Sequence, residues 1–117
     1  MNLVDFKKFI YNKLTDITTA QVFNNVVPVD FNYSNPFVTY QIEGESAIYT
    51  MKELAGNEFN VTINYHSKNQ TDLDDFYERL IDQFKNEDYI IRFNNSTELY
   101  NEDIQMHQLT CIYRSLV

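Results

Sequence analysis

Glycine, proline and cysteine are scarce in this chain, and tryptophan is absent. The sequence has two glycines, two prolines and one cysteine in 117 residues. Glycine-rich phosphate loops and repetitive turn-rich barrels both need many residues with positive φ, so neither is expected. A single cysteine, Cys111, permits neither an intramolecular disulfide nor a cysteine-based zinc site. Such a chain suits a reducing cytoplasm.

Basic residues are also few. Nine Lys and Arg stand against 17 Asp and Glu, so the formal net charge is −8. Neutralising a phosphate backbone requires clustered Lys and Arg, so specific nucleic-acid binding is not expected. An acidic surface fits two other roles. It can dock on a basic protein, or it can line a passage through which DNA slides without being retained.

Long apolar runs are missing as well. The first 14 residues carry Asp5, Lys7 and Lys8 within their apolar pattern, so they are expected to form neither a signal peptide nor a membrane span. Apolar residues nevertheless make up 44% of the chain and aromatic residues 15%, which is typical of a packed globular protein. The length predicts a single domain, residues 1–117, with one core.

Two amphipathic helices are predicted from hydrophobic spacing. The first has Asn2 as its N-cap, carries its apolar face from Leu3 to Leu14 and ends at Thr18 and Thr19; the second runs from Thr71 to Lys85, with Thr71 as its N-cap. Their apolar residues recur at intervals of three and four. In the first helix they are Leu3, Phe6, Ile10 and Leu14, and in the second Leu73, Phe76, Tyr77, Leu80, Ile81 and Phe84.

Strands are predicted from alternation and from β-branched and aromatic content. In residues 59–66, Phe59, Val61, Ile63 and Tyr65 face the core, whereas the alternate residues, His66 included, face water. Further strands are expected at 37–42, 46–51, 89–93 and 106–113, with a short extended segment at 22–27. Gly44, residues 52–57, which contain Gly56-Asn57, and the polar residues 94–97 are expected to form turns and loops.

These elements together predict the fold class. The order is helix, three strands, helix, two strands. The expected fold is therefore a single α+β domain, with a mainly antiparallel sheet packed by two amphipathic helices.

The candidate chemical groups favour structural explanations. Asp72, Asp74 and Asp75 could bind a hard cation, but no glycine bends a loop around them, and capping of a helix start explains all three. His66 and His107 are the possible general bases, and Glu102 and Asp103 lie near His107 in sequence. No nucleophile in a strained turn accompanies either histidine, so no catalytic, metal or cofactor site is expected. Cys111 shares its strand face with apolar residues and is predicted to be buried.

One segment is more apolar than an exposed loop requires. Residues 48–54 form the tip of a predicted hairpin, and Ile48, Tyr49, Met51 and Leu54 are the candidate partner contacts. The alternative is that this tip folds back on the sheet. Tyr33 and Phe37, aromatic residues near turns, are expected to serve packing or a protein interface.

The order and spacing of these segments resemble the tail-completion, or tail-terminator, proteins of long-tailed bacteriophages. The resemblance spans nearly the whole chain. It includes the N-terminal amphipathic helix, the strand opening Pro36-Phe37-Val38-Thr39-Tyr40, the strand Phe59 to His66 leading into the helix Leu73 to Phe84, and the closing strand that ends Ile112-Tyr113-Arg114.

The resemblance implies a structural protein without enzyme activity or cofactor. It implies assembly in the host cytoplasm into a ring, commonly of six copies, at the head-proximal end of the virion tail. There the ring would stop growth of the tail tube and dock the head connector, so tail-tube and connector proteins are the implied partners, and DNA would pass through. Two rivals remain: an acidic inhibitor or immunity-type module that binds a basic protein, and a small hydrolase that uses His107 with Glu102 or Asp103.

Overall fold

The computed structural model describes residues 2–50, 53–85 and 90–117. It contains two helices and five strands in the predicted order, which confirms the α+β class. The elements are α1 (Leu3–Ile17), β1 (Gln21–Asn24), β2 (Phe37–Thr50), β3 (Glu53–Ser67), α2 (Gln70–Lys85), β4 (Ile90–Asn101) and β5 (Met106–Leu116).

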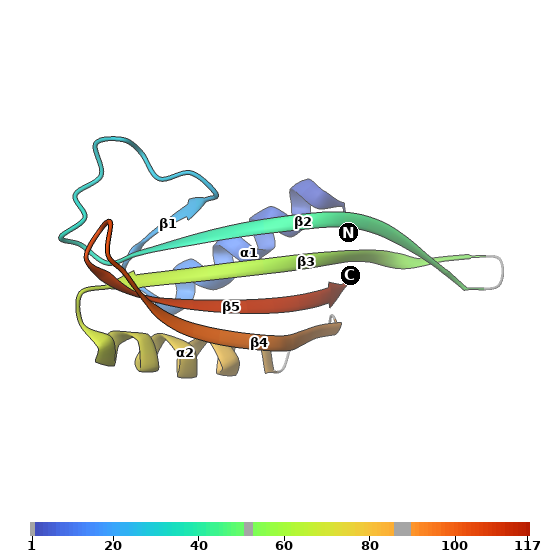
Figure 1. Cartoon of the computed structure of the whole chain (residues 1–117). Helices are drawn as coiled ribbons and strands as arrows, with labels where there is room; N and C mark the ends of the chain where they lie inside the picture. Colours follow the sequence, from blue (N-terminus) through green and yellow to red (C-terminus); the bar gives the residue numbers. More distant parts are fainter. Residues whose placement is uncertain (1, 51–52, 86–89) are drawn as a thin grey trace.

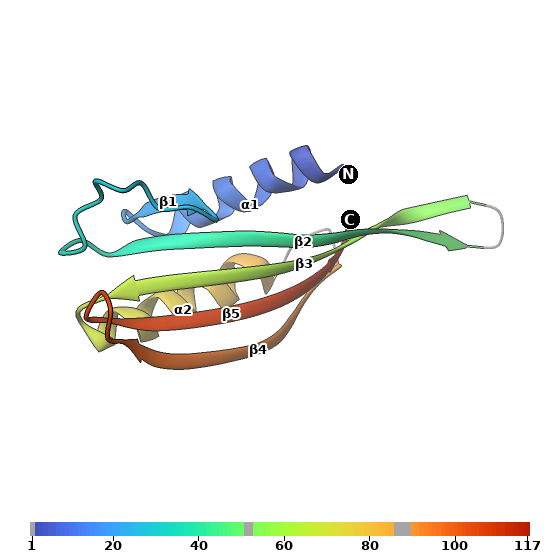
Figure 2. The same ribbon diagram turned by 45° about the horizontal axis from the view of Figure 1, so that its top comes forward.

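All five strands belong to one sheet with the order β1-β2-β3-β5-β4. The pairs β2–β3, β3–β5 and β4–β5 are antiparallel, and only the short β1 pairs in parallel, with β2. Both helices lie on the same face of the sheet, as the two views in Figures 1 and 2 show. Neither of the two described helices lies on the opposite face, and we call it the open face.

The core fills the layer between the sheet and the helices. Aromatic rings stack across this layer: Phe6 on Phe59, with centroids 4.7 Å apart, and Tyr65 on Phe76, at 4.4 Å. The inward alternation predicted for β3 and the apolar stripes predicted for both helices are confirmed. The buried residues of this core come from α1 (Phe6, Ile10, Leu14), β2 (Val38, Tyr40), β3 (Phe59, Val61, Ile63, Tyr65), α2 (Leu73, Phe76, Leu80, Phe84) and β5 (Leu109, Cys111, Tyr113).

The helix starts show one confirmed cap and one corrected cap. Asn2 Oδ1 accepts a hydrogen bond from the Asp5 N–H at 2.8 Å, as predicted. The second helix begins at Gln70, and Asn69 Oδ1 accepts from both the N–H and the hydroxyl of Thr71. The prediction of Thr71 as the N-cap was therefore wrong by two residues. An asparagine at this position offers the same acceptor as a threonine, so the sequence pattern alone did not separate them.

Three predicted turns are parts of long strands instead. Gly44 lies inside β2, where its φ of 70° accompanies a break in register between Glu43 and Ser46. A glycine tolerates this conformation without strain, so the chain bulges and continues rather than reversing. Of the turn expected at 52–57, residues 53–57 lie in β3, and residue 52 is outside the described residues. The expected loop at 94–97 lies in β4, which bulges between Phe93 and Asn95 and then stays paired to Asn101.

The exposed position predicted for His66 was also wrong. His66 pairs with Phe37 across β2 and β3, and the two rings stack with centroids 4.2 Å apart. Phe31 and Tyr33, from the connection between β1 and β2, pack edge-on against Phe37 at 5.1 and 5.6 Å. Because this connection contributes an aromatic cluster around Phe37, His66 is only 7% exposed.

Candidate assembly interface

The histidine and acids of the candidate catalytic group are not joined in the structure. His107 lies on β5, half-buried, and its ring contacts that of Tyr100 at 5.1 Å. Glu102 and Asp103 are exposed in the turn between β4 and β5, where the Asp103 N–H donates to Asn101 Oδ1. Among the described residues, no hydrogen bond or ion pair links His107 to either acid. The geometry therefore offers no oriented general base.

The two other reactive side chains are buried and neutral. Burial lowers the pKa of His66 to about 4, and its Nδ1 has no hydrogen-bond partner in the described part of the chain. Burial raises the pKa of the Cys111 thiol to about 12, which confirms the prediction of a buried small hydrophobe. A protonated thiol that solvent does not reach is a poor nucleophile.

The acidic residues at the start of α2 have structural partners. Asp72 accepts a hydrogen bond from the Ser67 hydroxyl at 2.8 Å, and Asp75 pairs with Arg79 at 3.2 Å. Asp74 is exposed. Within residues 2–50, 53–85 and 90–117, no cluster of three His, Cys, Asp or Glu side chains is arranged to hold a metal ion.

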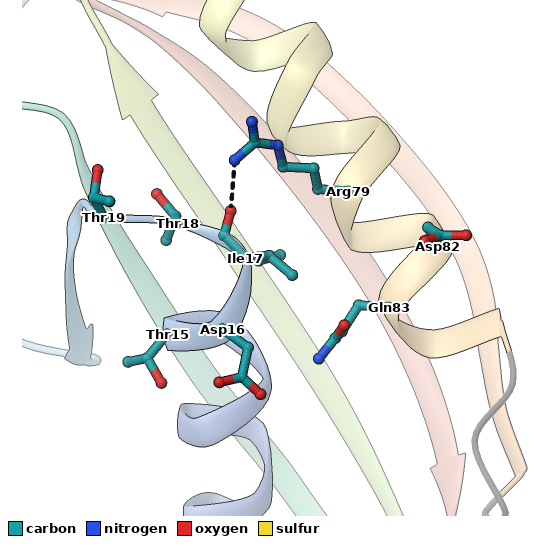
Figure 3. Close-up of a pocket in the computed structure, with 8 residues that line it drawn as sticks. All are labelled: Thr15, Asp16, Ile17, Thr18, Thr19, Arg79, Asp82 and Gln83. Atoms are coloured by element: carbon teal, nitrogen blue, oxygen red, sulfur yellow. Dashed lines mark hydrogen bonds between the residues drawn. The ribbon is translucent and has the colours of Figure 1, made fainter.

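A shallow hollow of about 350 Å³ lies between the end of α1 and α2. Figure 3 shows its lining: Thr15, Asp16, Ile17, Thr18 and Thr19 from the first helix and the residues after it, and Arg79, Asp82 and Gln83 from the second helix. Arg79 Nη1 donates a hydrogen bond to the Ile17 carbonyl at 3.2 Å. A cation at the carboxyl end of a helix is stabilising, so Arg79 of α2 stabilises the end of α1 and links the two helices. Beside this contact the hollow is lined by the carboxylates of Asp16 and Asp82 and by threonine hydroxyls, and its lining includes neither histidine nor cysteine.

The most distinctive feature is a hairpin that continues past the rest of the sheet. Strand β5 pairs with β3 only from Glu58 onward, and the last contact between them is a pair of backbone hydrogen bonds between Asn57 and Val117. Beyond this point the pairs Ile48↔Gly56, Tyr49↔Leu54 and Thr50↔Glu53 join β2 and β3 alone. We call residues 48–50 and 53–56 the arm. It extends away from the helices and from the other strands in Figures 1 and 2.

The arm gives the molecule its elongated outline of 52 × 28 × 22 Å. A two-stranded ribbon with no third strand and no helix against it is marginally stable in water, so the arm is a suitable element for contact with another protein. It contains Ile48, Tyr49 and Leu54, three of the residues predicted as partner contacts. The fourth, Met51, lies outside the described residues.

The open face of the sheet is polar in its middle. Asn64 Oδ1 accepts hydrogen bonds from the Thr110 hydroxyl at 2.7 Å and from Gln108 Nε2 at 3.3 Å, across β3 and β5. These three side chains satisfy one another's hydrogen-bonding groups, and none of them is charged. The exposed carboxylates of α2, by contrast, lie on the other side of the sheet.

Comparison with known proteins is informative only at the level of structure. No protein-family model matches the chain, and no curated protein matches it in sequence. No helix in the described part of the chain is long and apolar enough to cross a membrane. A solved chain from the "Virion of native gene transfer agent (GTA) particle" superimposes with a TM-score of 0.64, at 12% sequence identity, over 92% of this chain and 90% of that one. The two chains share a fold over nearly their whole lengths.

Proposed function

We propose that this protein is a structural component of a virion, and specifically a tail-completion (tail-terminator) protein. It forms a ring at the head-proximal end of the tail tube, stops growth of the tube and presents a docking surface to the head connector. The observation that carries this proposal is the shared fold with a chain of a gene transfer agent virion, which extends over both chains almost from end to end. The order and spacing of the sequence segments support the same family.

Two features of the structure support assembly rather than catalysis. The arm extends beyond the packed body, where a neighbouring protein can support it. The possible reactive groups are either buried, as His66 and Cys111 are, or separated from their expected partners, as His107 is. A ring protein needs contact surfaces and no reacting centre, which agrees with both features.

The proposal is tested by locating the protein in particles. A short peptide tag placed ahead of Met1 is introduced into the native gene, and purified particles are labelled with gold-conjugated antibody and viewed by electron microscopy. Gold at the joint between head and tail is expected. Gold along the whole tail, at its distal tip or on the capsid would refute the tail-completion function while leaving a virion role in place. Particles without the tagged protein would refute both.

A second candidate function rests on the exposed side of α2. Asp74, Asp75, Glu78 and Asp82 are all exposed on this helix, and an acidic helix face of this kind can bind a basic enzyme and block it. Affinity capture with the purified protein distinguishes the two functions. A basic partner held one-to-one, and released by reversing the charges on α2, would favour the inhibitor.

A further inference from the structure

The sheet has two open edges, and the first is β4. This strand is the outermost on its side of the sheet and is 12 residues long. Its described side chains are exposed from Arg92 to Tyr100, and three large apolar ones are well above a third exposed: Phe93 at 39%, Leu99 at 46% and Tyr100 at 51%. The outward N–H and C=O groups of such a strand form a template for another strand.

The second open edge is the outer side of β2. Strand β1 covers β2 only from Phe37 to Tyr40, so among the described strands nothing pairs with this side from Gln41 to Thr50. The last three residues of this edge belong to the arm. The edge therefore begins beside the packed body and continues past it.

Both edges lack part of the usual protection against pairing. Natural sheet edges are guarded by lysine and other charged side chains, by proline, by bulges or by very short strands. Strand β2 has register shifts between Glu43 and Ser46 and between Ile48 and Tyr49. Residues 41–50 and 90–101 contain no lysine and no proline, and both edges are long. The bulge after Phe93 interrupts β4 near its start, but the pairing with β5 is unbroken from Asn95 to Asn101. These seven residues are the regular part of the edge.

The charges on the two edges favour pairing between unlike edges. On the β2 edge Glu43 is exposed and acidic, and residues 41–50 contain no lysine or arginine, so two copies of this edge would repel one another. Strand β4 carries two exposed charges, Arg92 and Glu98, and Arg114 lies directly across from Arg92 on β5. Arg114 already pairs with Glu58, whereas Arg92 has no ion pair within the described part of the chain. Arg92 is therefore available to an acidic edge.

We infer that the outer edge of β2 in one copy, including its arm, adds as a strand to the outer edge of β4 in the next copy. This contact joins two different surfaces, so it repeats head to tail and closes into a ring when the rotation between neighbours allows it. The sheet of each subunit then continues into the next, and the neighbour supports the arm. The inference rests on the proposed ring assembly, and it identifies the two surfaces that form the contact.

The inference is tested by cysteine cross-linking between two purified full-length proteins. One carries Ala47→Cys on the β2 edge, and the other carries a cysteine in turn at Ser96, Thr97, Glu98 and Leu99. The native Cys111 is fully buried and does not compete. After mild oxidation, mixed disulfide dimers are counted by mass spectrometry. The matched control replaces the β4 cysteine with Asn12→Cys, on the exposed side of α1.

One β4 position is expected to give a mixed-dimer yield roughly tenfold above the Asn12 control, because pairing raises the effective concentration of the two thiols. Yields should fall on either side of that position, since register fixes one nearest neighbour. Adding Arg92→Glu to the β4 partner should lower the peak yield, whereas Lys85→Glu, the same charge change on α2, should not. Equal yields at all positions and at the control would refute edge pairing.

The cross-linking test and the gold-labelling test can fail separately. Gold label at the head–tail joint with no cross-linking peak would leave the tail function in place and refute the edge contact. A clear cross-linking peak with no label at the joint would establish self-association through these edges and refute the tail function.

Discussion

The burial of His66 makes the stability of this protein depend on pH in a calculable way. Its pKa falls from the ordinary value of 6.5 to about 4 in the folded state, because the ring is buried against Phe37. Between these two values the unfolded chain binds a proton at this site and the folded chain does not. The free energy of unfolding therefore falls as pH is lowered from 6.5 to 4. One pH unit of displacement corresponds to about 1.4 kcal/mol, so the loss from this group is about 3 kcal/mol.

The assay is urea denaturation followed by far-ultraviolet circular dichroism at several values between pH 7 and pH 4. His66→Phe keeps a flat ring against Phe37 and removes the buried Nδ1 that has no described partner. This variant should lose about 3 kcal/mol less than the wild type over the interval. His107→Gln, which changes the half-buried histidine, is the matched control and should decline as the wild type does. Equal declines in the wild type and His66→Phe would refute the reasoning.

Three further predictions concern the cap, the thiol and the arm. Asn69→Ala should lower the free energy of unfolding by about 1 kcal/mol, and Thr71→Ala by less; the reverse order in urea denaturation would restore Thr71 as the cap. Cys111 should react with a thiol reagent only in denaturant, because burial raises its pKa to about 12, and rapid reaction of the native protein would contradict this burial. Replacing residues 48–54 by Asn-Gly should leave the denaturation midpoint nearly unchanged, because the described strand pairs of this segment join β2 and β3 alone and none involves β5. The variant should fail to restore normal particles when it is supplied to a genome in which this gene is disrupted. Full restoration would show that the arm is dispensable.

The helices and the central strand were predictable because their burial is one-sided. Phe6, Ile10 and Leu14 recur at helical spacing, and Val61 and Ile63 alternate along β3, since each element has one face on the core. In such elements the spacing of apolar residues along the local sequence indicates which face packs on the core. This is why the fold class and the element order followed from periodicity alone.

Strand β4 was only partly predictable because it lies at an edge. Residues 94–97, Asn-Asn-Ser-Thr, are exposed on both sides, so no alternation of apolar and polar residues marks them as a strand. Pairing with β5, which extends to Asn101, holds them in the sheet. Their own composition favours a turn, and the neighbouring strand overrides that preference.

The burial of His66 depends on a contact that local sequence does not encode. The residue continues the polar alternation of β3, so water is the natural expectation for its side chain. Phe31 and Tyr33, which are more than 30 positions from His66 in sequence, build an aromatic cluster around its stacking partner Phe37. Their aromatic character indicated that they would pack, but the sequence did not indicate that they would pack around Phe37 and bury His66.

The composition of residues 48–54 indicated a contact surface, but not its shape. Residues 48–50 and 53–54 extend beyond the body because β3 continues past its last pairing with β5. The relative length of two strands in a sheet is a long-range property, and it becomes visible only when the register is known. Register also revealed the open edge of β2, which the sequence did not suggest.

Tail length in particles that lack this protein tests the central claim most directly. The gene is disrupted in its native genome, a lysate is induced, and tail lengths are measured by negative-stain electron microscopy beside those of the intact genome. A tail-completion function predicts overlong or irregular tails together with unattached, DNA-filled heads, and restoration of normal joined particles when the wild-type gene is supplied. Joined particles with tails of normal length in the absence of the protein would contradict the account.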